Sequence, residues 1–151
     1  MLLTGTFNRA IDEKLRVAIP KPLREAFSKS SAAKNVVYVA PGTDGSLALY
    51  AEESLAELAK RLAQSSPGAQ EVRAFSRLFY SRAQAVEIDG QGRVRIPSEL
   101  AQLAGLEKEA VLVGVQDHLE LWEPRRWAEY VGQCQNQFDE LAERAFEGPG
   151  S

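Results

Sequence analysis

The chain has 151 residues, of which 44% are hydrophobic, and a formal net charge of −3 at pH 7. This composition is typical of a globular protein with one core, or with two small cores that support each other. No apolar stretch approaches the ~20 residues of a membrane-spanning helix, and the opening MLLTGTFNRA lacks the basic and apolar regions of a secretory signal. We therefore expect a cytoplasmic protein.

The chain has a single cysteine, Cys134, and a single histidine, His118, which limits the disulfides and metal sites that it can form. One cysteine excludes an internal disulfide, and the two residues cannot supply the ligand cluster of a structural zinc site. We expect neither a metal nor a cofactor.

The small net charge conceals an uneven distribution. Residues 1–95 contain 14 Lys and Arg against 10 Asp and Glu, whereas residues 96–151 contain 4 against 11. Local positive fields attract phosphate more than the overall charge does. The distribution permits DNA binding by the first part of the chain, but on charge alone an ordinary solvated surface is the favoured interpretation.

Residues 11–24, IDEKLRVAIPKPLR, predict a short strand and then a short helix. Val17 and Ile19 alternate with Arg16 and Ala18, which is the period of a half-buried strand whose arginine faces away from the core. Pro22 suits the first turn of a helix. The apolar face of this helix is formed by Leu23, Ala26 and Phe27.

The next segment, VVYVAPGTDGSLALYAEES, predicts two strands joined by a turn. An amphipathic helix follows, with Leu55, Leu58, Ala59 and Leu62 on one face. The segment Ser65–Gly68 then breaks the helix. A connecting helix follows, marked by Val72, Phe75, Leu78 and Phe79 and carrying Arg73, Arg77 and Arg82.

The second half of the chain repeats this order. Residues 88–101, IDGQGRVRIPSELA, align with residues 11–24 without a gap, and a helix with Leu100, Leu103 and Ala104 ends before Gly105. The strand pair AVLVGVQDHLELW comes next. A long helix after Pro124 carries the stripe Trp127, Tyr130, Val131, Cys134, Phe138 and Leu141, which predicts a packed rather than a reactive cysteine.

The repeat predicts two homologous modules. We place the first at residues 1–65, a connecting helix at 66–84, and the second at 85–134 with its terminal helix extending to about residue 146. Each module is too small to bury much apolar surface alone. Pairing of the two modules about a pseudo-twofold axis is the expected solution.

The pattern D-x-x-x-R-V-x-I-P near the N-terminus, its repetition as DGQGRVRIP, and the later AGL and LELWEP stretches resemble the MraZ family over nearly the whole chain. The resemblance implies an α+β fold of two swapped-hairpin, AbrB-like modules, with further copies of the chain arranged in a homo-oligomeric ring. It also implies a nucleoid-associated repressor that binds repeated DNA boxes upstream of the division and cell-wall gene cluster, its own promoter included.

The resemblance places the DNA-contacting arginine of the family at Arg16 and Arg93. From their positions on or beside the same strand and turn, we add Arg9, Lys14 and Arg95, since arginine binds phosphate or guanine bidentately and Lys14 suits phosphate alone. We expect three loop-organising residues: Asp12, Asp89 and Gly92. Alternatively, each arginine forms a salt bridge to the aspartate of its own loop, and the two roles are compatible.

Leu15 departs from the family motif, which has glycine there, as at Gly92. If this position has a positive φ, leucine costs ~1 to 2 kcal/mol. We expect either a different turn in the first loop or compensating contacts.

Other classes of protein fit the sequence less well. It contains no nucleophile elbow, phosphate-binding loop or metal-spaced ligand set, and we place His118 in a turn, as a surface residue without partners; we therefore expect no enzymatic activity. The main alternative is an antitoxin-like or scaffold protein-interaction module, which would use the acidic C-terminal part to bind a basic partner.

Overall fold

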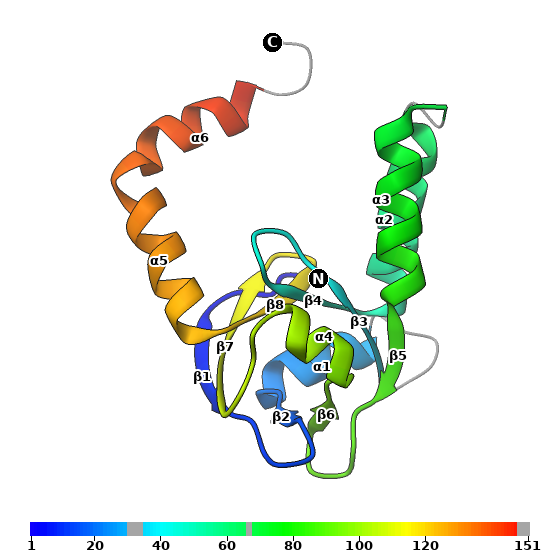
Figure 1. Cartoon of the computed structure of the whole chain (residues 1–151), viewed down its shortest axis with the longest axis vertical. Coiled ribbons are helices and arrows are strands. Elements are labelled where there is room, and N and C mark those ends of the chain that lie inside the picture. Colours follow the sequence, from blue (N-terminus) through cyan, green and yellow to red (C-terminus); the bar gives the residue numbers. More distant parts are fainter. Residues whose placement is uncertain (30–34, 66–67, 148–151) are drawn as a thin grey trace.

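The computed structural model describes residues 1–29, 35–65 and 68–147. Its strands are β1 (Thr6–Ala10), β2 (Arg16–Ala18), β3 (Val36–Pro41), β4 (Leu47–Tyr50), β5 (Gln84–Glu87), β6 (Arg93–Arg95), β7 (Glu109–Val115) and β8 (His118–Trp122). The α-helices are α1 (Lys21–Lys29), α2 (Glu52–Gln64), α3 (Gln70–Arg82), α4 (Ser98–Leu103), α5 (Pro124–Cys134) and α6 (Phe138–Glu147) (Figure 1). Part of the predicted break at Ser65–Gly68 lies outside the described residues.

A six-stranded antiparallel sheet combines strands of both halves in the order β1-β7-β8-β4-β3-β5. The first strand of each half pairs with the other half: β1 lies beside β7, with Asn8 opposite Val111, and β5 lies beside β3, with Val86 opposite Val37. In the repeat, β1 corresponds to β5, β3 to β7 and β4 to β8. With these correspondences the strand order is the same from either edge of the sheet, as expected for two related halves. The predicted α+β fold with two related β modules is therefore confirmed.

A second, two-stranded sheet joins the repeated segments directly. In it β2 runs antiparallel to β6, with Val17 opposite Val94. Both valines are buried, as are Ile19 and Ile96. One hydrophobic cluster contains these side chains together with Leu23 and Phe27 of α1 and with Leu100, Ala101 and Ala104 at α4. The two modules thus share one main core, as expected for units too small to bury much apolar surface alone.

The structure corrects two predictions about apolar helix faces. Leu103 was predicted to pack but is 46% exposed, because Leu100, Ala101 and Ala104 form the buried side of that turn. The long terminal helix is interrupted by a 3-10 turn at Gln135–Gln137, and beyond it Phe138 and Leu141 are exposed. Cys134 is half-buried rather than in a core.

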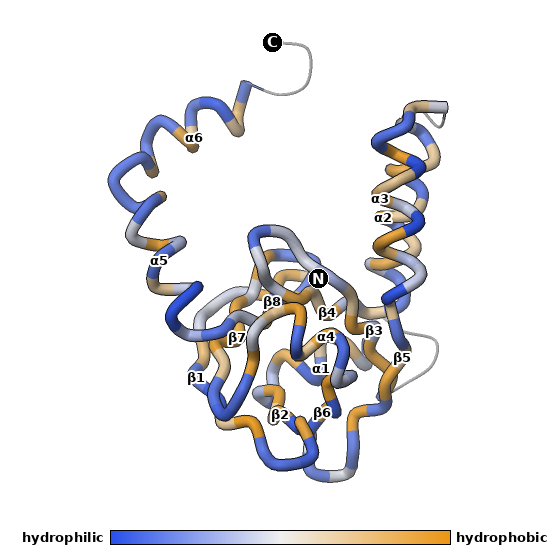
Figure 2. Tube along the Cα trace, viewed as in Figure 1, coloured by the Kyte–Doolittle hydropathy of each residue, from blue (hydrophilic) through white to orange (hydrophobic). Residues whose placement is uncertain are grey.

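The helices other than α1 and α4 lie at one end of the molecule and the two repeated loops at the other (Figure 1). Helices α2 and α3 run side by side away from the sheet, where Leu55 and Leu58 of α2 join Tyr50 and Phe79 in a second apolar cluster. Trp127 and Tyr130 of α5 pack on Trp122, and α6 projects beyond them. Figure 2 shows apolar positions recurring along α3 and α6.

No helix in the described ranges is long and apolar enough to cross a membrane.

Candidate nucleic-acid interface

The loop between β1 and β2 is organised by Asp12. Its Oδ1 accepts hydrogen bonds from the backbone N–H groups of Lys14 and Arg16, each at 2.9 Å, and its Oδ2 accepts from Nε of Arg16 at 2.6 Å. Leu15 donates its backbone N–H to the Asp12 carbonyl at 3.0 Å. One carboxylate therefore fixes both the turn and the direction of the Arg16 side chain.

The loop between β5 and β6 repeats this arrangement. Oδ1 of Asp89 accepts from the backbone N–H groups of Gln91 and Arg93, each at 2.9 Å, and Oδ2 accepts from Nε of Arg93 at 3.1 Å. Gly92 donates its N–H to the Asp89 carbonyl at 3.0 Å. The predicted salt bridges to Asp12 and Asp89 are thus present, and they coexist with loops in which the arginines remain partly exposed.

These hydrogen bonds lower the pKa of both aspartates. The backbone N–H of Arg16 contributes most to lowering the pKa of Asp12, and the backbone N–H of Arg93 does the same for Asp89; the arginine side chains lower each pKa further.

Leu15 has a φ of 60° and Gly92 a φ of 79°, so both loops use a left-handed residue at the same position. The first loop therefore does not adopt a different turn. Leu15 is partly buried against the main core, and fully burying a leucine would contribute ~1.5 to 3 kcal/mol. The partial burial offsets at least part of the ~1 to 2 kcal/mol cost of a left-handed leucine.

The two loops adjoin and interlock. The carbonyl of Leu15 accepts from the N–H of Ile96 at 2.8 Å, and the carbonyl of Gly92 accepts from the N–H of Ile19 at 2.9 Å. Nη1 of Arg93 also lies 4.0 Å from Oδ2 of Asp12. The left-handed residue of each loop is therefore hydrogen-bonded to the other half of the chain.

Three of the predicted arginines share one face. Arg16 is paired with Arg95, and Ala18 with Arg93, across the β2–β6 ribbon, while Val17 and Val94 point into the core. Directly paired residues, and residues two positions apart, lie on the same side of a sheet. Arg16, Arg93 and Arg95 therefore form one outward patch with contributions from both halves.

Arg9 and Lys14 border this patch in different ways. Arg9 lies on β1, and its guanidinium donates to the carbonyls of Ala18 at 3.2 Å and Asn8 at 2.9 Å. It is thus held beside the end of β2. Lys14 is exposed near the tip of the first loop. The aligned positions of the second half are Val86 and Gln91, so these two cations occur once per chain.

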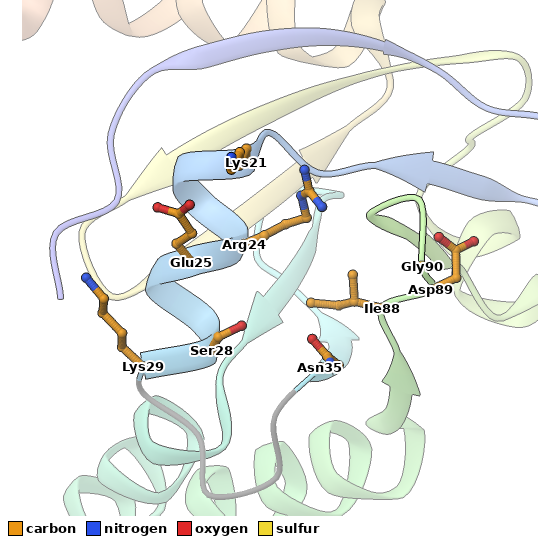
Figure 3. Close-up of a pocket in the computed structure, with 9 residues that line it drawn as sticks. All are labelled: Lys21, Arg24, Glu25, Ser28, Lys29, Asn35, Ile88, Asp89 and Gly90. Atoms are coloured by element: carbon orange, nitrogen blue, oxygen red, sulfur yellow. The ribbon is translucent and has the colours of Figure 1, made fainter.

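Sequence reasoning missed Arg24, which lies on α1 in an open pocket beside the second loop (Figure 3). The available signal was the repeat itself, because the alignment places Arg24 opposite Ala101.

The structure also corrects the prediction for His118. It begins β8 rather than lying in a turn, its side chain is 16% exposed, and its ring stacks on Tyr50. Its Nδ1 lies 2.8 Å from Asp117 and its Nε2 3.4 Å from Glu120.

Among the residues that the structure describes, no group of three or more His, Cys, Asp or Glu side chains could hold a metal ion.

Comparison with known proteins identifies the repeat. The family model described as MraZ protein, with the qualifier antitoxin-like, matches residues 2–78 and again residues 79–148. A protein of Thermomicrobium roseum named Transcriptional regulator MraZ is 40% identical over 127 residues, covering 84% of this chain and 85% of the relative. Proteins with the same name from Symbiobacterium thermophilum and Lactiplantibacillus plantarum are 35% and 38% identical, covering 93% and 92% of this chain and 97% and 94% of the relatives.

Proposed function

Because this chain belongs to the MraZ family, whose relatives are named transcriptional regulators rather than enzymes, we propose that it is a sequence-specific DNA-binding regulator of transcription. The observation that carries the proposal is the patch of Arg16, Arg93 and Arg95 on the β2–β6 ribbon. A two-stranded ribbon fits the major groove of B-DNA, where arginine reads guanine bidentately.

In this proposal the aspartates orient the arginine side chains for contact with DNA. Arg16 and Arg93 each use Nε to bind the carboxylate of their own loop, while their Nη groups carry the remaining donors. Arg16 and Arg93 read base edges, and Arg95, Arg9 and Lys14 contact phosphate, which sets the orientation of the protein on the duplex.

The more specific role that we propose follows the family resemblance. The protein represses the division and cell-wall gene cluster, including its own promoter, by binding repeated boxes upstream of it in the nucleoid. Each loop pair offers few base contacts and should bind one box weakly. Boxes spaced near one helical turn allow several subunits to bind at once, so that avidity replaces individual affinity.

We further propose that the subunits form a closed ring, with α6 of one copy packed on α3 of the next. Helix α6 exposes Phe138, Leu141 and Phe146, and its first turn is acidic. Helix α3 exposes Phe75 and Leu78 and carries Arg73, Arg77 and Arg82. Both helices therefore expose apolar side chains, accompanied by acidic residues on α6 and by basic residues on α3. This complementarity favours a head-to-tail contact between copies, and repeated head-to-tail contacts form a ring when the rotation closes.

The division of the chain follows from the same proposal. Residues 1–65 and 85–134 supply the two DNA-binding modules, residues 66–84 connect them, and the terminal helices extend the second module to about residue 146.

The test is a mobility-shift titration of the chain with a labelled fragment from upstream of its own gene, across a salt series. We expect specific binding that weakens as salt increases and that falls by about tenfold or more for each arginine lost in the Arg16→Ala/Arg93→Ala variant. Size-exclusion chromatography verifies that the variant still assembles. Binding no tighter than to random DNA of the same length would refute the proposal.

A second function, an antitoxin-like or scaffold module, is favoured by the exposed apolar face of α6. Deletion of residues 138–151 distinguishes the two. If it abolishes regulation while the arginine variant retains it, the functional surface binds a protein rather than DNA.

A further inference from the structure

Arg24 lies between α1 and the second loop, in an open pocket of about 510 Å³. Figure 3 shows its side chain leaving α1 toward the loop that begins at Ile88, Asp89 and Gly90. The Nε atom of Arg24 is buried and has no hydrogen-bond partner within the described ranges. Packing rather than hydrogen bonding by Nε therefore places this part of the side chain.

The atom group against which Arg24 packs is the backbone of Gly92. A Cβ at position 92 would lie 2.5 Å from Cζ and from Nη1 of Arg24, and 2.7 Å from Nε. The guanidinium occupies the space that a side chain at position 92 would need. Gly92 is thus required for this contact as well as for its left-handed backbone.

In the first loop, the large and the small residue occupy the opposite positions of the repeat. In the repeat alignment, Leu15 corresponds to Gly92 and Ala101 to Arg24. Leu15 packs against the core cluster that contains Ala101. The second loop thus has glycine facing arginine, whereas the alignment gives the first loop a large residue, Leu15, and the corresponding helix position a small one, Ala101.

We propose that Arg24 is a positioning residue for the second DNA-binding loop, and that the pair Leu15 and Ala101 has this role in the first. The position of residue 92 matters because its carbonyl binds the N–H of Ile19 at 2.9 Å and the next residue is Arg93. Displacing residue 92 therefore moves the arginine and loosens the contact with the other half. The role in DNA binding rests on the function proposed above.

The two loops are consequently not interchangeable. In this proposal the leucine at position 15 is more than a tolerated departure from a glycine motif, because it is matched to a small residue at position 101. Likewise, the glycine at position 92 is paired with an arginine at position 24. Each loop residue is matched to the helix residue of the other module.

The experiment transplants one pair into the place of the other. Gly92→Leu, Arg24→Ala and the double variant Gly92→Leu/Arg24→Ala are compared with the native chain. The readouts are amide exchange at Gln91 and Arg93, whose N–H groups bind Asp89, urea unfolding, and affinity for the upstream fragment across a salt series. The reciprocal variant, Leu15→Gly/Ala101→Arg, tests the first loop in the same way, with Ala101→Arg as its control.

We expect Gly92→Leu to accelerate exchange and to weaken DNA binding by about tenfold, the effect of a displaced loop arginine. The double variant should recover part of the exchange protection and DNA affinity lost in Gly92→Leu, although it keeps the left-handed leucine and has lost a cation. Arg24→Ala should accelerate loop exchange without reducing the salt slope, because a positioning residue neutralises no phosphate.

Two results would overturn the proposal. In the first, the double variant exchanges as fast as Gly92→Leu alone. In the second, Arg24→Ala leaves exchange unchanged but lowers the salt slope by about one phosphate contact, which would make Arg24 a direct DNA ligand. Exchange is measured without DNA, so the pairing is tested even if the native chain fails to bind the fragment.

Discussion

His118 connects the second module to α2 through a charged cluster. Its imidazole stacks on Tyr50 and lies between Asp117 and Glu120, while Arg61 of α2 lies 3.6 Å from Asp117. Burial alone would lower the pKa of His118, but hydrogen bonds to Glu120 and Asp117 outweigh it, and the pKa is raised above 6.5. Burial and the same carboxylates raise the pKa of Tyr50 to about 12.

The raised pKa predicts a stability change with a definite sign. The folded chain holds the proton of His118 more tightly than the unfolded chain, so its contribution is complete below pH 6.5 and is lost as the pH rises through the folded value. Urea unfolding should therefore give a free energy that declines on the alkaline side of pH 6.5 in the native chain and declines less in His118→Gln. A decline of the same size in both proteins would show that another group is responsible.

At the scale of single residues, the sequence predicted contacts within one turn better than contacts between distant parts of the chain. The pairing of Arg16 with Asp12 was predictable because both belong to one turn. The environment of His118 was not, because Tyr50, 68 positions earlier, comes next to it only through the pairing of β4 with β8. The same reason concealed the contact between Arg24 and Gly92.

At the scale of elements, the loops are stable because one carboxylate satisfies several backbone donors. Asn at position 12 retains an Oδ1 acceptor for the N–H groups of Lys14 and Arg16, whereas Ala loses it. We expect amide exchange at Lys14 and Arg16 to accelerate by about tenfold in Asp12→Ala, the effect of losing one or two hydrogen bonds, and to accelerate less in Asp12→Asn, whose neutral oxygen is a weaker acceptor than a carboxylate. Equal acceleration in both variants would mean that the negative charge, and not the acceptor geometry, organises the loop.

The pKa of Asp12 gives the same element a pH dependence of the opposite sign to that of His118. Because this pKa is lowered, the stabilising effect of the carboxylate is present above its usual value of 3.8 and is lost as the pH falls through the lowered value. Exchange at Arg16, corrected for the intrinsic rate, should therefore remain slow through mildly acidic conditions. The accelerated exchange of Asp12→Ala provides the reference for a disorganised loop.

The order of elements could be predicted from periodicity and from the repeat, but not all of their partners. The alternation of Val17 and Ile19 locates β2, and Pro22 lies in the first turn of α1. The residues of β1 do not specify that it pairs with β7 of the other half, because many apolar strands could take that edge. The interruption of the last helix at Gln135–Gln137 has no signal in the apolar stripe, which continues across it.

At the scale of the whole molecule, the two ends of the chain's structure differ in charge and in the role that we propose for them. The paired loops lie at one end, and the acidic helix α6 lies at the opposite end (Figure 1). This placement keeps carboxylates away from a duplex bound at the loops, so a negative net charge does not prevent phosphate binding. It also leaves the α3 and α6 faces available for contacts between copies while the loops bind DNA.

The proposed ring depends on the exposed apolar face of α6, where Phe138 is 71% exposed and Leu141 is 41% exposed. Serine at both positions removes that face without touching the core. We expect light scattering with size-exclusion chromatography to show a closed oligomer for the native chain and a smaller species for Phe138→Ser/Leu141→Ser, with an unchanged urea midpoint. Leu103→Ser, which alters an exposed leucine on α4, is the matched control and should assemble normally. Affinity for a single box should survive in the double variant, whereas the gain from added boxes should be lost, because only the ring supplies avidity. A double variant that still assembles like the native chain would rule out α6 as the contact.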